Sequence, residues 1–213
     1  MAGTDGHRVE SGPAHALERL IFFSDAVFAI AITLLVIEIH VPEVHGDHPS
    51  DIAFIAALAQ LIPNFIGFFT SFFVTGAFWA GHHRAFDCAR NYSPKLVWPN
   101  LTMLSAIAAM PFFTAFSSEY FGQRVPVTLY CGWLLLTALL NIRVVRLATS
   151  LAIAGEEMTD ARRWAIRRRG IGVALGAATA VVVSLFVPLA GQPALISIPF
   201  WMFLLSQFGP KAR

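Results

Sequence analysis

The chain has 213 residues, of which 56% are hydrophobic and only 13% are charged, with a formal net charge of +2 and a mean hydropathy of +0.64. A soluble domain carries about a quarter charged residues, so this chain has too few to cover a surface that faces water. The composition excludes an ordinary soluble domain and predicts a protein embedded in a lipid bilayer, to which its 19 Phe and 5 Trp are suited.

Three regions follow along the chain. Residues 1–16 include Arg8 and Glu10 and contain no apolar stretch, so they are predicted to be a polar tail and not a cleavable signal peptide. Residues 17–208 are strongly apolar and show no internal repeat, and they are predicted to form one membrane domain. Residues 209–213 are a short C-terminal tail.

Six apolar stretches approach the length of about 20 residues that a helix needs to cross a bilayer. The second is long enough to tilt or to kink at Pro63, and the last is short for a full crossing. The sequence therefore predicts an all-α, polytopic membrane protein with six transmembrane helices. In chain order these are Leu17–Ile39, Ile52–Ala80, Leu96–Phe116, Val125–Leu147, Ile171–Ala190 and Ala194–Phe208.

The basic residues predict the orientation of these helices. With six crossings, fourteen of the fifteen Lys and Arg residues fall on one side and Arg124 alone falls on the other. The positive-inside rule then places both termini in the cytoplasm. The densest basic segment, Arg162 to Arg169, is predicted to lie in a loop as a topology anchor against anionic lipids.

The first predicted helix carries polar groups that need an explanation, because such groups are costly in hydrocarbon. Asp25 lies about two turns inside the helix and must bond to a neighbour. At 100° per residue, a largely aliphatic face that includes Ile30, Leu34 and Ile37 points away from Asp25. Periodicity alone does not decide whether that face meets lipid, a partner or a pore.

A motif at the start of this helix, Arg19-x-x-x-Phe23-Ser24-Asp25, resembles the signature of the transmembrane protein 175 family of potassium channels. Further positions of the resemblance lie on the second and third predicted helices. The motifs cover about the first 120 residues, and the rest agrees in topology. These further positions are Trp79, His82, His83, Phe86, Asn100, Pro111, Phe112 and Thr114.

The resemblance implies a potassium-selective cation channel without the Thr-Val-Gly-Tyr-Gly filter loop. Four identical six-helix subunits would place their first helices around a central pore. Ile30 would form a hydrophobic constriction, Leu34 and Ile37 the next layers, and Thr33 a polar ring beside them. Selectivity could come from the dehydration that a narrow apolar neck imposes or from Thr33 hydroxyls.

The same resemblance implies a supporting network turned away from the pore. In it, the motif side chains of Arg19, Ser24 and Asp25 would bond to the second and third helices and hold the pore helix in register. Their predicted partners are Trp79, His82 or His83, and Asn100.

Particular residues also fit two other functions and a metal site. A proton-coupled secondary transporter would use Asp25 as its relay, and an intramembrane enzyme would use Asp25 with a histidine. The loop histidines His40, His45 and His48, together with Glu43 and Asp47, contain enough ligands for a metal ion, although an exposed polar loop is favoured.

No enzymatic activity is predicted, because no Walker loop, dinucleotide fingerprint or zinc-protease helix is present in the sequence. The expected partners are further copies of the chain and the bilayer, without nucleic acid or a soluble partner. No cofactor is expected, and K⁺ enters only as the permeant ion. The expected location is the cell membrane, as a multi-pass protein of the bacterial inner membrane.

Overall fold

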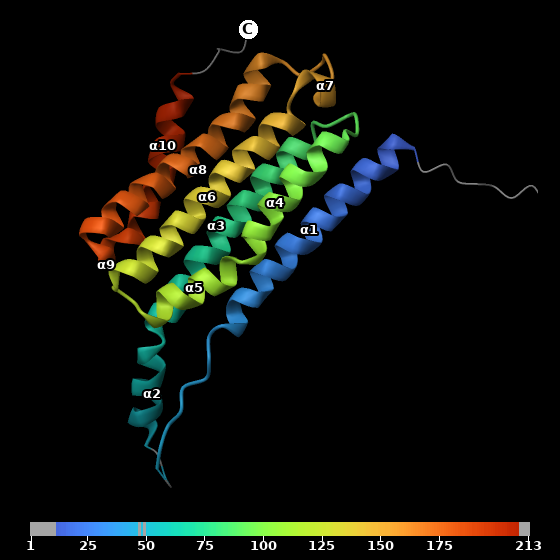
Figure 1. Ribbon diagram of the computed structural model, residues 1–213. Coiled ribbons are helices and arrows are strands. Elements are labelled where there is room, and N and C mark those ends of the chain that lie inside the picture. Colours follow the sequence, from blue (N-terminus) through green and yellow to red (C-terminus); the bar gives the residue numbers. More distant parts are fainter. Residues whose placement is uncertain (1–11, 47, 49, 209–213) are drawn as a thin grey trace, which may run out of the picture.

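The structure is a computed structural model that describes residues 12–46, 48 and 50–208. Its regular elements are all helices, which lie side by side in an elongated bundle (Figure 1). Six of the helical stretches in the described residues are long and apolar enough to cross a membrane. The predicted all-α fold with six transmembrane helices is therefore confirmed.

Helix α1 (Pro13–Ile37) forms one edge of the bundle and packs against the third, fourth and fifth helices (Figure 1). It begins four residues before the predicted Leu17, because Pro13 at its first position has the backbone φ angle of a helix and needs no N–H bond there. Helix α1 thus includes residues 13–16 of the predicted tail, and residues 1–11 lie outside the described part.

The second predicted helix, Ile52–Ala80, is not one continuous element, so that part of the prediction is wrong. It is divided into α2 (Asp51–Gln60) and α3 (Ile62–Phe86), which meet at Leu61. Pro63, where a kink was expected, lies in the first turn of α3, and without an N–H it cannot continue the hydrogen bonds of α2. As a result, α2 projects beyond the end of the bundle (Figure 1).

The third crossing is also interrupted by a proline. A 3₁₀ turn, η1 (Pro94–Leu96), leads into α4 (Val97–Ala108), which is followed by α5 (Met110–Glu119). Pro111 lies in the first turn of α5, where its missing N–H is tolerated. Helix α6 (Arg124–Ala148) agrees with the predicted fourth helix.

The fifth predicted helix begins much earlier than expected. After a short helix, α7 (Leu151–Ala154), helix α8 runs over Asp160–Phe186 instead of starting at Ile171. Thr159 accepts the Arg162 backbone N–H and caps the first turn. The basic segment is therefore helical, which corrects its assignment to a loop.

The sixth crossing consists of three pieces, which end in α10 packed against α8. Gly172 and Gly176 of α8 allow α10 to approach closely. A Cβ atom on Gly172 would lie 2.7 Å from Met202 Cγ, and one on Gly176 would overlap Ile198. The three pieces are α9 (Pro188–Gly191), η2 (Pro193–Ile196) and α10 (Ser197–Ser206).

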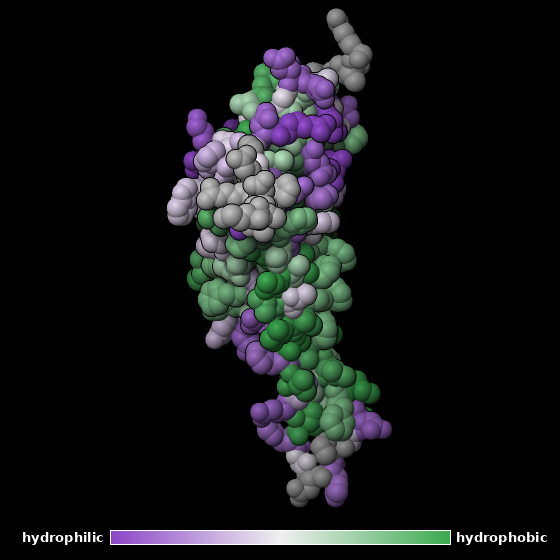
Figure 2. Space-filling model, turned by 90° about the vertical axis from the view of Figure 1, so that its right-hand side faces the viewer, coloured by the Kyte–Doolittle hydropathy of each residue, from purple (hydrophilic) through white to green (hydrophobic). Residues whose placement is uncertain are grey.

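The two ends of the described chain lie at the same end of the bundle, as an even number of crossings requires (Figure 1). Polar residues gather at this end on the face that carries α1, and a broad apolar band follows below it (Figure 2). This arrangement matches the profile of a membrane, with a hydrocarbon layer between polar boundaries. The assignment of this end to the cytoplasm stays a prediction.

Candidate functional site

One stripe of α1 faces the interior of the bundle. Ser24, Phe28, Ala31 and Leu35 are each 2% exposed or less. Their spacing of four, three and four residues places them on one side of a helix. This stripe attaches α1 to its neighbours through mainly apolar packing.

A different side of α1 carries the residues predicted to form the pore. Ile30 is 58% exposed, Leu34 39% and Ile37 66%, and Thr33 beside them is exposed too. The Thr33 hydroxyl donates to the Ile30 carbonyl at 2.9 Å. The structure therefore brings all four residues onto one uncovered, largely apolar surface of a single chain, which we call the α1 outer face.

Ser24 is attached to α3 and α4 by a chain of buried hydrogen bonds. The Asn100 amide on α4 donates to Ser24 Oγ at 2.8 Å, and Ser24 Oγ donates in turn to the Leu20 carbonyl at 2.7 Å. At its other end, Asn100 Oδ1 lies 2.8 Å from His82 Nε2 on α3. Because an amide oxygen only accepts, His82 Nε2 must carry the proton.

Aromatic rings surround the imidazole of His82. The ring of Phe86 stacks on it at 4.3 Å between centroids, and Phe28 of α1 lies at 5.6 Å. His82 is 1% exposed. The histidine is therefore a buried structural group with one hydrogen-bond partner among the described residues, and it is not poised in an open cleft for catalysis.

Asp25 lies beside this buried chain and binds α3 independently. Trp79 Nε1 donates to Asp25 Oδ1 at 2.8 Å. The Trp79 ring stacks on His83 at 5.4 Å, and His83 Nε2 lies 3.5 Å from a carboxylate oxygen of Asp87. Together, Ser24 and Asp25 hold the middle of α1 against α3 and α4 from two adjacent directions.

Two residues of the motif are not brought into these contacts. Arg19 and Phe23 are exposed on α1. Within the described part of the chain, the Arg19 side chain makes neither a hydrogen bond nor an ion pair. The structure brings the other predicted residues together in these contacts: Ser24, Asp25, Trp79, His82, His83 and Asn100.

Sequence reasoning missed a second buried polar cluster, nearer the other end of the bundle. Ser71 Oγ on α3 lies 2.7 Å from Thr114 Oγ1 on α5 and 2.9 Å from the Tyr130 hydroxyl on α6. A third hydrogen bond runs from the Gln192 side-chain amide to Ser117 Oγ, at 2.8 Å. The signal in the sequence was the presence of hydroxyl groups within apolar helices, where partners are expected.

The described residues of the loop that was predicted as a weaker metal candidate are not gathered around a common point. His45 and Glu43 are 3.8 Å apart and strongly exposed, and Asp47 lies outside the described residues. In the described ranges, no group of three or more His, Cys, Asp or Glu side chains is placed to hold a metal ion.

Comparison with known sequences places the chain among channel proteins. The family model described as "Endosomal/lysosomal potassium channel TMEM175" matches residues 19–111. A potassium channel of Chamaesiphon minutus is 34% identical over 139 residues, which cover 64% of this chain and 68% of that protein. A potassium channel of Streptomyces collinus is 39% identical over 101 residues, which cover 47% of each. The chain thus spans about half to two thirds of the length of these relatives.

The similarity of structure extends further along the chain. The crystal structure of a lysosomal potassium-selective channel TMEM175 homolog from Chamaesiphon minutus matches with a TM-score of 0.69 and 28% sequence identity. The match covers 91% of this chain and 96% of that one. The shared fold therefore extends well beyond the motif-bearing segment of the chain.

Proposed function

Because the chain belongs to the family described as the endosomal/lysosomal potassium channel TMEM175, we propose that it is a subunit of a potassium-selective cation channel. The family is one of ion channels and not of enzymes, and the chain is a multi-pass membrane protein. We propose further that it resides in a bacterial inner membrane with both termini in the cytoplasm.

The observation that carries the proposal is the α1 outer face. Ile30, Leu34 and Ile37 are large apolar side chains that stay exposed among the described residues of the chain. A homotetramer with four copies of α1 around one axis would bring these side chains together as successive rings. No filter loop would be needed, because the rings themselves narrow the path.

Thr33 supplies the oxygen that an aliphatic ring lacks. Its hydroxyl proton is donated to the Ile30 carbonyl, so the lone pairs of its oxygen remain available to a passing cation. Four such oxygens near the Ile30 ring could replace part of the hydration shell of K⁺. This geometry favours a threonine ring as a contributor to selectivity beside the apolar neck.

The contacts of Ser24 and Asp25 would keep α1 in register while ions pass. They fasten the helix from the side opposite its outer face, through Asn100 and Trp79. A rigid attachment matters because a constriction works only if its side chains stay within a fraction of an ångström of one radius. Asp25 therefore acts in this proposal as a positioning residue and not as a proton relay.

Flux measurements with an Ile30→Asn variant test the proposal. Purified protein in liposomes should pass K⁺ down its gradient and show unitary current steps in a planar bilayer. Ile30→Asn replaces an apolar ring with a polar one, so it should admit Na⁺ more readily and lower the K⁺-over-Na⁺ permeability ratio at least several-fold.

Val36→Asn is the matched control, since Val36 is 52% exposed and lies about 120° around α1 from Ile30. It should leave the permeability ratio unchanged. An unchanged ratio in Ile30→Asn, or an equal change in both variants, would contradict the assigned pore face. K⁺ uptake that stops when a proton gradient is collapsed would instead favour the proton-coupled transporter.

A further inference from the structure

A groove runs down the outside of the bundle between α6 and α8, away from α1. Its volume is about 590 Å³, within the range of roughly 300–1,000 Å³ that small-molecule sites occupy. Apolar side chains of both helices form its floor, while Arg143 and Arg146 of α6 lie along its length toward the charged end. The floor includes Leu139, Ile142, Ile171 and Leu175.

The groove has a polar end and an apolar end. Helix α6 runs toward the end of the bundle where the termini lie, so Arg146 is nearest that boundary (Figure 1). Leu139 lies seven residues earlier, which is about 10 Å deeper in the membrane. On α8, Ile171 and Leu175 lie one turn apart and contribute to the apolar floor.

Among the described residues, no acidic side chain forms an ion pair with Arg143 or Arg146. Both arginines are exposed. None of the residues lining the groove is acidic. Arg167 lies nearby and adds further charge, since it donates to the Arg146 carbonyl at 3.0 Å.

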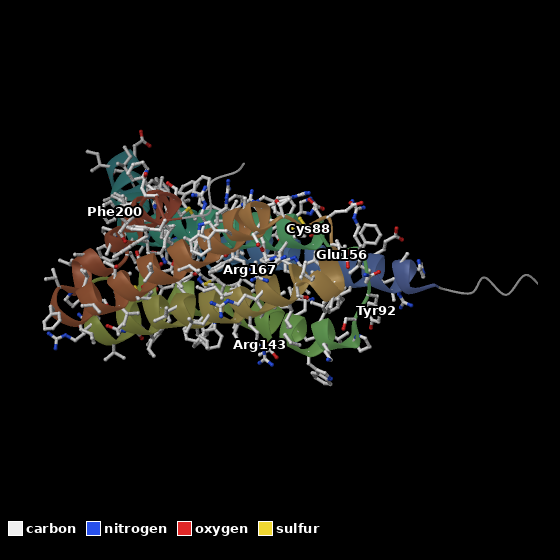
Figure 3. All side chains as sticks on the ribbon, turned by 90° about the horizontal axis from the view of Figure 1, so that it is seen from above. Cys88, Tyr92, Arg143, Glu156, Arg167 and Phe200 are labelled. Carbon is white, nitrogen blue, oxygen red and sulfur yellow. The ribbon has the colours of Figure 1, made fainter. Side chains whose placement is uncertain are left out.

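Figure 3 shows the positions of Arg143 and Arg167. Arg143 lies at the outer edge of the bundle, and Arg167 lies over its middle. The Arg167 side chain binds the C-terminal end of α6, where it also donates to Thr149 Oγ1 at 2.9 Å. The side chains of Arg143 and Arg146 make no hydrogen bond or ion pair among the described residues, so they are free to bind a ligand that approaches from the lipid.

We propose that this groove binds an anionic glycerophospholipid of the leaflet on the side of the termini. Its phosphate would be bound by Arg143 and Arg146, and one acyl chain would lie on the apolar floor. An anionic headgroup complements the arginines, and the chain complements Leu139 and Ile142 about 10 Å below them. This site is remote from the α1 outer face and does not depend on the proposed channel function.

Native mass spectrometry of the purified full chain tests the proposal. The protein is titrated with dioleoyl phosphatidylglycerol and with dioleoyl phosphatidylcholine, which have the same acyl chains and differ in headgroup charge. The anionic lipid should bind more tightly. In the double variant Arg143→Gln/Arg146→Gln, its affinity should fall at least about tenfold, because each arginine near a membrane surface contributes severalfold.

Arg90→Gln/Arg162→Gln is the matched control, since both arginines are exposed at the same end and lie outside the groove. It should retain the wild-type affinity. Equal binding of the two lipids, an equal loss in both double variants, or no loss in Arg143→Gln/Arg146→Gln would overturn the proposal. Displacement of the lipid by soluble glycerol 3-phosphate would reduce the site to a general anion site and would overturn it as well.

Discussion

Asn100 joins three helices through the two ends of one side-chain amide. Its nitrogen donates to Ser24 on α1 and its oxygen accepts from His82 on α3, and all three side chains are essentially inaccessible. Asn100→Leu would leave the His82 N–H without a partner inside the bundle. We expect the free energy of unfolding to fall by about 1–3 kcal/mol, the cost of a buried unsatisfied polar group.

Thermal unfolding in detergent measures this loss for Asn100→Leu. Asn91→Leu is the control, because Asn91 is exposed and its amide makes one long hydrogen bond, of 3.4 Å, to the Ala152 carbonyl. Asn91→Leu should change the unfolding midpoint little. Equal midpoints for the two variants would show that the chain of hydrogen bonds through Asn100 contributes no stability.

At the scale of elements, the close contact of α8 with α10 depends on glycine at positions 172 and 176 of α8, where a side chain would not fit. A Cβ at Gly176 would overlap Ile198, whose Cα would also lie only 3.1 Å away. Gly176→Val should therefore push α10 outward and lower the free energy of unfolding by about 1–3 kcal/mol, the usual cost of overpacking. A second change, Ile198→Ala, should recover part of the loss.

Gly132→Ala on α6 is the control for this series, since nothing lies within 4 Å of the Cβ that it would add. It should be neutral or slightly stabilising, because Ala has the higher helix propensity. Thermal unfolding of the three variants and the wild type makes the comparison. A stable Gly176→Val, or a loss that Ile198→Ala does not reduce, would argue against close packing at this position.

At the scale of the whole molecule, the orientation of the bundle in the membrane is open to a direct test. Ser50 lies in the connection between α1 and α2. Glu156 lies toward the end of the bundle at which both ends of the described chain are found, as Figure 3 shows for Glu156. In intact bacterial cells, a membrane-impermeant maleimide should label Ser50→Cys directly. It should label Glu156→Cys only after the membrane has been permeabilised.

The native thiols of Cys88 and Cys131 are both buried, so they should give little background labelling. The reverse pattern, with Glu156→Cys labelled first, would place the termini outside and contradict the positive-inside prediction. Labelling of both positions in intact cells would contradict the six-helix topology itself.

How far the sequence predicts this protein differs between its parts. The membrane class and the six crossings follow from local composition, because each crossing satisfies its own backbone hydrogen bonds within one apolar segment. The placement of Ile30, Leu34 and Ile37 on one side of α1 follows from the helical period, while only the structure shows that this side is exposed. Where prolines or charges interrupt a segment, as at Pro63 and before Ile171, the exact ends of helices could not be predicted, because capping and neighbouring helices decide them.

The sequence by itself determined that the chain crosses a membrane, how often it does so, and which motif begins its first helix. These properties depend on residues that are neighbours along the chain. Only the tertiary structure decided that Asn100 bonds to Ser24, 76 positions away, and that Arg19 makes no such contact. It also decided that Arg143 and Arg146 line a largely apolar groove. Such contacts depend on how helices rotate and pack against one another, which no local pattern of residues encodes.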